Sequence, residues 1–145
     1  MTVNLNSSAN TNNDIFQGNA GPGIVTNQGY VLMFTSLIQN NGSNGRPGIS
    51  AISHSAIRLI TSTVSGSGGA GVNVEGGSEA TFEESRVTRN AGSGVVISDS
   101  SYGLFTASNI TGNLSGTDVS CRPQFPATRG ALTDIGGGTT NCIEP

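Results

Sequence analysis

The chain of 145 residues contains no lysine, and only 10% of its residues are charged. Its six basic residues are arginines that form no run, whereas a phosphate-binding surface needs a concentrated basic patch. Nucleic acid is therefore not expected as a partner. The longest apolar run, Val31–Phe34, is far too short to cross a bilayer, so no membrane span is expected. The first residues, MTVNLNSSAN, lack the basic start and apolar core of a signal peptide.

Hydrophobic residues are also scarce, at 34%, compared with about 45–50% in ordinary globular domains. The 22 glycines and the abundant serine, threonine and asparagine would suit a disordered chain, which buries little surface. However, the net charge is only −3, and valine, isoleucine, leucine and phenylalanine recur at fixed intervals. This regularity indicates a single domain that buries small apolar sets many times over.

The chain has two cysteines, Cys121 and Cys142, both near the C-terminus. Neither has a histidine nearby in the sequence, and their spacing is not that of a zinc motif. They form either a disulfide that closes a terminal loop or two reduced thiols, and we favour the disulfide. Such a bond would indicate an extracellular, periplasmic or cell-surface location.

Two independent markers repeat along the chain with nearly the same period. A glycine followed by isoleucine or valine recurs at steps of 25, 23 and 23 residues, and the copies are Gly23-Ile24, Gly48-Ile49, Gly71-Val72 and Gly94-Val95. A weaker copy, Gly116-Thr117, follows after 22 more residues. Before each of the four later copies stands a serine, with isoleucine or valine two positions on and asparagine or serine five positions on. These copies are Ser36/Ile38/Asn41, Ser62/Val64/Ser67, Ser85/Val87/Asn90 and Ser108/Ile110/Asn113. The step from Ser36 to Ser62 is 26 residues, longer than the other steps, and it predicts an insertion in the segment NNGSNGRPG.

Apolar residues alternate within each repeat, which places them on one face of short strands. Three such strands with turns between them would form one coil, and coils stacked about 4.8 Å apart would pair equivalent strands. The sequence therefore predicts an all-β parallel β-helix, a solenoid with rungs of about 23 residues. We expect rungs over residues 1–120 and an irregular C-terminal cap or tail over 121–145, with Phe125 and Leu132 as plugs. An antiparallel sandwich is the weaker alternative, because it needs no fixed register.

The small polar residues of the repeat are expected at the corners. We expect Ser62, Ser85 and Ser108 to turn inward or to form a ladder between strands. The asparagines should form another ladder, because asparagine tolerates left-handed backbone and its amide can bond neighbouring backbone; they are Asn41, Asn90 and Asn113. Glycines at the Gly23 position would supply the positive φ of a tight corner.

The segments QGNAGPGI, TRNAGSGVVI and SNITGN resemble the N-x-x-x-G-[IV] and S-x-[IV]-x-x-N rungs of the right-handed parallel β-helix, pectin-lyase-like superfamily. The likeness covers roughly Asp14–Val119. It implies a right-handed solenoid but not one activity, because the superfamily holds polysaccharide lyases, hydrolases, epimerases, phage tailspikes and surface proteins without known catalysis.

No catalytic residue is assigned, because no catalytic constellation emerges from the sequence. A glycosidase would need two carboxyls that face one sugar linkage, and the resemblance implies that a lyase would need a basic residue and often calcium. The candidate ligand-binding residues are Glu75, Glu79, Glu83, Asp99, Arg58 and Tyr102. These could form a small site for an acidic sugar or for calcium, although no cofactor is expected. The alternative interpretation is a solvated face with weak ion pairs. His54, the sole histidine, is expected on a turn.

An outward apolar column is expected on one sheet, and exposed apolar residues on a flat sheet suggest a partner surface. Its members are Leu32, Phe34, Ile60, Leu104 and Tyr102. A glycan is one candidate partner. A second copy of the chain is another, bound through this apolar sheet face or through an open solenoid end, where unpaired strand edges invite association.

The preferred function is a non-catalytic structural or carbohydrate-contacting module of an extracellular or cell-surface protein. The alternative is a fragment of a polysaccharide-active enzyme, a lyase, hydrolase or epimerase. A third interpretation is a truncated or engineered solenoid that associates with itself.

Overall fold

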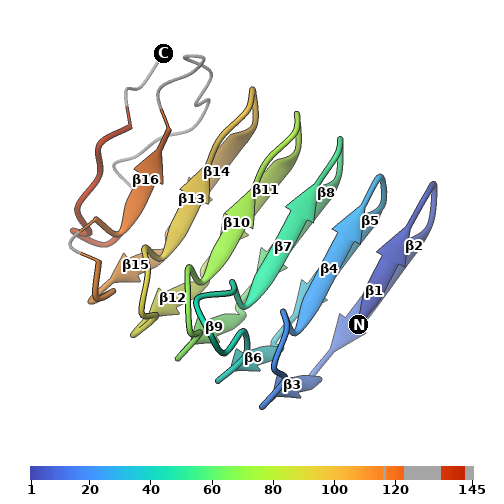
Figure 1. The fold of residues 1–145 in the computed structure, drawn as a ribbon, viewed down its shortest axis with the longest axis horizontal. Coiled ribbons are helices and arrows are strands. Elements are labelled where there is room, and N and C mark those ends of the chain that lie inside the picture. Colours follow the sequence, from blue (N-terminus) through green and yellow to red (C-terminus); the bar gives the residue numbers. More distant parts are fainter. Residues whose placement is uncertain (116, 123–134, 143–145) are drawn as a thin grey trace.

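The computed structural model describes residues 1–115, 117–122 and 135–142. These residues form three parallel sheets, and each successive coil of the chain adds one strand to each sheet (Figure 1). Sheet A contains β1 (Thr2–Asn4), β4 (Ile24–Asn27), β7 (Ile49–Ile52), β10 (Val72–Val74), β13 (Val95–Ile97) and β16 (Val119–Cys121). Sheet B contains β2 (Ser8–Asn12), β5 (Tyr30–Phe34), β8 (Ala56–Ile60), β11 (Glu79–Glu83) and β14 (Tyr102–Thr106). Sheet C contains β3 (Ile15–Gln17), β6 (Leu37–Gln39), β9 (Thr63–Ser65), β12 (Arg86–Thr88) and β15 (Asn109–Thr111).

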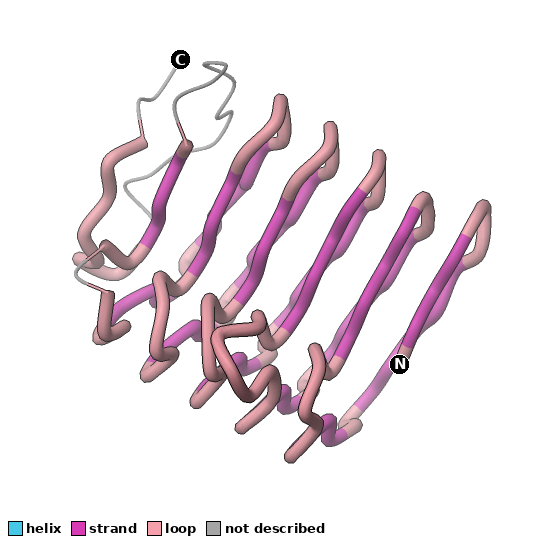
Figure 2. Tube along the Cα trace, in the orientation of Figure 1, coloured by secondary structure: helices cyan, strands magenta, loops and turns pink. Residues whose placement is uncertain are grey.

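The predicted parallel β-helix with rungs of about 23 residues is therefore confirmed. Strands alternate with short turns along every coil, and the coils stack in one direction from the N-terminus to the C-terminal segment (Figure 2). No helix long and apolar enough to cross a membrane occurs among the described residues.

The core is a narrow column of like residues stacked on like. Val72 pairs in register with Val95, and Val74 pairs with Ile97. The rings of Phe82 and Phe105 lie stacked with centroids 5.0 Å apart and planes 8° apart. Because most strands bury alternate side chains, a chain with few hydrophobic residues still fills a continuous core.

The corner between sheets B and C consists of one residue with positive φ followed by an inward serine. Thr61, for example, has a φ of 50°, and Ser62 behind it is buried. The backbone N–H of Ser62 donates to Oγ of Ser85 at 3.1 Å, and the N–H of Ser85 donates to Oγ of Ser108 at 3.2 Å. The predicted serine ladder is confirmed, and it pairs backbone groups that burial would otherwise leave unsatisfied.

A second serine ladder, which we did not expect, lies at the corner between sheets A and B. The N–H of Ser55 donates to Oγ of Ser78, and the N–H of Ser78 donates to Oγ of Ser101, each at 3.0 Å. Each of these serines lies in the turn that joins a sheet A strand to the following sheet B strand. Serine therefore closes two of the three corners of the coil.

Asparagine closes the third corner, between sheets C and A. The N–H of Ser67 donates to Oδ1 of Asn90 at 2.9 Å, and the N–H of Asn90 donates to Oδ1 of Asn113 at 3.1 Å. The side-chain amide of Asn90 also donates to Oδ1 of Asn113, at 2.9 Å. The amide role is confirmed. The expected left-handed backbone is wrong for the ladder residues, because the residue before each takes the positive φ, as Arg89 does at 57°.

The repeated glycines at this corner are needed because a side chain would not fit there, and not because of a positive φ. This corrects our expectation for the Gly23 column. None of Gly23, Gly48, Gly71 and Gly94 has a positive φ. A Cβ on Gly71 would lie 2.7 Å from the side-chain nitrogen of Asn90 and 2.6 Å from the Gly94 carbonyl oxygen. Glycine is thus required because the asparagine of the next rung fills the place of a side chain.

The predicted insertion lies between β6 and β7, where the turn is longer than its neighbours and stands out from the row of turns (Figure 2). The ladder changes at the same rung, because Ser67 takes the asparagine position. Its Oγ is buried and has no hydrogen-bond partner in the described structure.

Asp118 ends the asparagine ladder and joins it to the C-terminal segment. Its Oδ1 accepts from the backbone and side-chain amides of Asn113, at 3.0 and 2.9 Å. Its Oδ2 accepts from the N–H and Oγ1 of Thr139, at 3.0 and 3.1 Å. Burial alone would raise the pKa of Asp118, but these hydrogen bonds outweigh it and hold that pKa below its usual value. Ile135, from the same segment, is buried in the core.

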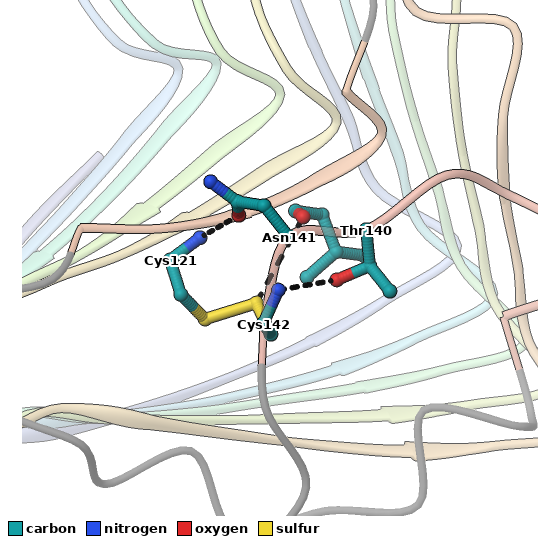
Figure 3. The surroundings of a disulfide bond; sticks show 5 residues. Cys121, Thr140, Asn141 and Cys142 are labelled. Carbon is teal, nitrogen blue, oxygen red and sulfur yellow. Dashed lines mark hydrogen bonds between the residues drawn. A yellow bond between two sulfur atoms is a disulfide. The ribbon is translucent and has the colours of Figure 1, made fainter.

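The predicted disulfide between Cys121 and Cys142 is confirmed, with Cα atoms 5.0 Å apart. Two hydrogen bonds support it: the N–H of Cys121 donates to Oδ1 of Asn141, and the N–H of Cys142 donates to Oγ1 of Thr140 (Figure 3). The bond ties the C-terminal segment to the last strand of sheet A. The predicted plugs Phe125 and Leu132 lie outside the described residues.

The close contacts around Gly71 predict that a single added methyl group destabilises the protein at this position but not at an open one. We expect Gly71→Ala to lower the free energy of unfolding by about 1–3 kcal/mol, because the neighbouring backbone and Asn90 must move. Gly21→Ala is the matched control, since its Cβ would meet no atom within 4 Å. Urea unfolding of both variants measures the difference, and equal stabilities would contradict the steric account.

The lowered pKa of Asp118 predicts acid sensitivity. The stabilisation is complete above the pKa of an unfolded aspartate, about 3.9, and is lost as the pH falls through the lower folded value. Asp118→Asn should lower the free energy of unfolding by about 1–3 kcal/mol at pH 7, because the NH2 group of the new side chain would face other hydrogen-bond donors. Urea unfolding between pH 7 and pH 3 should show the two proteins converging in acid. A difference independent of pH would refute the role of the carboxylate.

Candidate functional site

The outward face of sheet A carries one side chain per rung in a central column. The strand register aligns Val25 with Ser50, Ser50 with Asn73, Asn73 with Val96, and Val96 with Ser120. The inward neighbours of these residues are held in the core, so each outward side chain has a fixed position. Asn73, Val96 and Ser120 of this column form the floor of a groove.

The turns between sheets C and A form the wall of the groove. They stack so closely that a Cβ on Gly69 would lie 2.2 Å from the carbonyl oxygen of Gly45, and Gly92 donates its N–H to the Gly69 carbonyl at 2.8 Å. The wall is therefore mostly backbone. The groove encloses about 400 Å³, within the range of small-ligand sites. Its lining residues are Gly45, Pro47, Gly69, Ala70, Asn73, Glu75, Gly92, Ser93, Val96, Ser120 and Arg122.

The lining brings opposite charges and neutral polar groups into one groove. Glu75 directly follows β10 and Arg122 directly follows β16, two rungs further along the sheet. Asn73 contributes an amide, and Ser93 and Ser120 contribute hydroxyls. Such groups can donate and accept hydrogen bonds from a polyhydroxylated ligand. Glu75 is the carboxylate among the described lining residues, so the groove does not present the carboxyl pair of a glycosidase.

The structure does not bring the predicted ligand-binding residues together. Glu75 lies in the groove on sheet A, whereas four others lie on the outward face of sheet B: Arg58, Glu79, Glu83 and Tyr102. There the Arg58 Nε donates to Glu83 Oε1 at 2.7 Å, and this partner raises the pKa of the guanidinium. Glu83 projects outward because Phe82 points into the core, as expected.

The remaining predicted residues lie at the corner between sheets A and B. Asp99 is exposed in the turn after β13, where its carbonyl accepts from the Gly77 N–H. His54 is exposed on the turn between β7 and β8, as predicted, and borders a second cavity of about 430 Å³ with Asn6, Gln28 and Tyr30. Within the described part of the chain, no three histidine, cysteine, aspartate or glutamate side chains gather as metal ligands.

Sequence reasoning missed most of the groove. Asn73 was a detectable candidate, because it stands between the inward residues Val72 and Val74 and must face outward. Ser93 and Arg122 gave no such signal, since their places depend on how the turns stack and on the strand that follows the last full rung.

Comparison with known protein families gives a match. The family model described as "Right handed beta helix region" matches residues 24–129, well over half of the chain. No curated protein and no solved structure was found to match.

Proposed function

Because the chain belongs to the right-handed β-helix family, we propose that it is a non-catalytic module that contacts carbohydrate through the groove on sheet A. The observation that carries this proposal is the groove itself, in which Asn73, Glu75 and Arg122 stand on a rigid floor. A binding surface held in place by strand register loses little conformational entropy when a ligand binds.

The composition of the groove supports a glycan over other small ligands. Its polar groups can satisfy hydroxyls as both donors and acceptors, and Val96 on the floor offers an apolar contact for a sugar ring. Glu75 and Arg122 carry charges of opposite sign, so the groove does not strongly favour a multiply charged anion. Hydrogen bonds to a charged group are stronger than those between neutral groups, so Glu75 and Arg122 should contribute most to binding.

The disulfide supports an extracellular or cell-surface setting, because such bonds persist in oxidising compartments. A stack of coils joined by side-chain ladders also suits a structural role outside the cell.

The proposal predicts that one face of the solenoid binds glycan. A glycan array should identify a ligand, and calorimetry should show that Glu75→Gln weakens its binding about 10-fold or more, as expected for the loss of a charged hydrogen bond of about 1.5–3 kcal/mol. Glu79→Gln, on sheet B, is the matched control and should bind as the parent does.

Two results would contradict this proposal. If the Glu75→Gln variant and the parent bind the glycan with equal affinity, the ligand does not bind in the groove. Release of shortened or unsaturated sugars from the bound glycan, lost in Glu75→Gln, would show that the module is catalytic.

A further inference from the structure

The long turn between β6 and β7 contains two asparagine–glycine pairs, Asn41-Gly42 and Asn44-Gly45. In such a pair the backbone nitrogen of the glycine can attack the amide carbon of the asparagine side chain, because glycine has no Cβ to obstruct the closing ring. Both pairs belong to the turn that stands out from the row of turns (Figure 2). Since the two pairs have the same chemistry, the fold decides which of them can react.

The first pair is held by hydrogen bonds on both reacting groups. Asn41 is 1% exposed, and its Oδ1 accepts from the backbone and side-chain amides of Asn19 at 3.1 and 2.8 Å. Its side-chain nitrogen donates to the Phe16 carbonyl at 2.8 Å. The Gly42 N–H donates to the carbonyl oxygens of Asn19 and Gly21, each at 2.9 Å. Ring closure at this pair would require all of these bonds to break first.

The second pair is open on both reacting groups. Asn44 and Gly45 are exposed at the centre of a turn that the Arg46 N–H closes by donating to the Gly42 carbonyl at 3.0 Å. Within the described part of the chain, neither the Asn44 side chain nor the Gly45 N–H has a hydrogen-bond partner. A Cβ on Gly45 would meet no atom within 4 Å, so there is room for a ring at this position.

We propose that Asn44 is a site of spontaneous covalent modification, at which the chain deamidates through a cyclic imide. The Gly45 backbone nitrogen gives up its proton to solvent and attacks Cγ of Asn44, and a C–N bond forms. The bond from Cγ to Nδ2 breaks, and the leaving NH2 group takes up a proton and departs as ammonia. Water then opens the imide at one of its two carbonyl carbons, which gives aspartate or isoaspartate. Water is the one co-reactant that this sequence of steps consumes.

The modification would change the edge of the groove on sheet A, because Gly45 lines that groove. Either product places a carboxylate at position 44 and makes the net charge of the chain one unit more negative than −3. Isoaspartate also adds a methylene carbon to the backbone directly before Gly45. The site therefore lies where a slow chemical change can alter both the charge and the shape of the groove wall.

Mass spectrometry of the folded chain tests the proposal. The purified protein is incubated at about pH 9 and about 37 °C, and fragmentation of its peptides locates each conversion of asparagine to aspartate or isoaspartate. Asn44 should convert at least about 10-fold faster than Asn41, because the hydrogen bonds around Asn41 must open before its ring can close. In concentrated urea, which unfolds the chain, the two asparagines should convert at similar rates.

The variant Asn44→Gln serves as the matched control, because its longer side chain would need a larger ring that closes slowly. It should lose the isoaspartate at this position, and circular dichroism should show the fold of the parent. Two results would overturn the proposal. One is an Asn44 that stays intact in the folded chain over a time in which it converts in urea. The other is an Asn41 that converts as fast as Asn44 while the chain is folded.

Discussion

The side-chain amide of an asparagine holds the corner at which each coil passes to the next. Asn90 accepts the Ser67 N–H of the preceding rung and donates to Asn113 of the following one. The amide occupies the space that a side chain on Gly71 would need. The hydrogen bonds of the asparagine are therefore possible only because the facing residue is a glycine without a Cβ. This pairing holds neighbouring rungs together and sets the period of the chain. At the other two corners, the serine ladders also join neighbouring rungs, through backbone N–H groups that donate to serine Oγ atoms.

The sequence predicts the stack well and its corners only in part. The alternating apolar residues and the two repeated markers predicted the inward apolar columns, because a parallel stack puts like residues on like. The roles of the corner residues were partly wrong: the Gly23 column was expected to need positive φ, but space for the asparagine explains it. The ladder of Ser55, Ser78 and Ser101 was detectable from its steps of 23 residues and was not recognised.

The candidate site was harder to predict than the fold. Glu75 and Glu83 stand eight positions apart in one rung, yet they lie on different sheets. The sequence analysis assigned them to one site because they are close in sequence, whereas the coil places them on separate faces. A solenoid gives each outward column its own face. Once the ladders fix the coil, sheet A presents a polar groove, whereas sheet B presents the charged residues Arg58, Glu79 and Glu83 beside exposed apolar side chains.

The stability of an Asn90→Ala variant tests most directly whether the ladder holds the coils together. This change leaves the Ser67 N–H without its partner and removes one of the two hydrogen bonds that Asn90 donates to Asn113 Oδ1, at a corner where Asn90 is fully buried. Urea unfolding should show a loss of about 2–4 kcal/mol. Asn10→Ala on the exposed face of β2 should change stability by less than about 0.5 kcal/mol. An Asn90→Ala variant as stable as the Asn10→Ala variant would contradict the account.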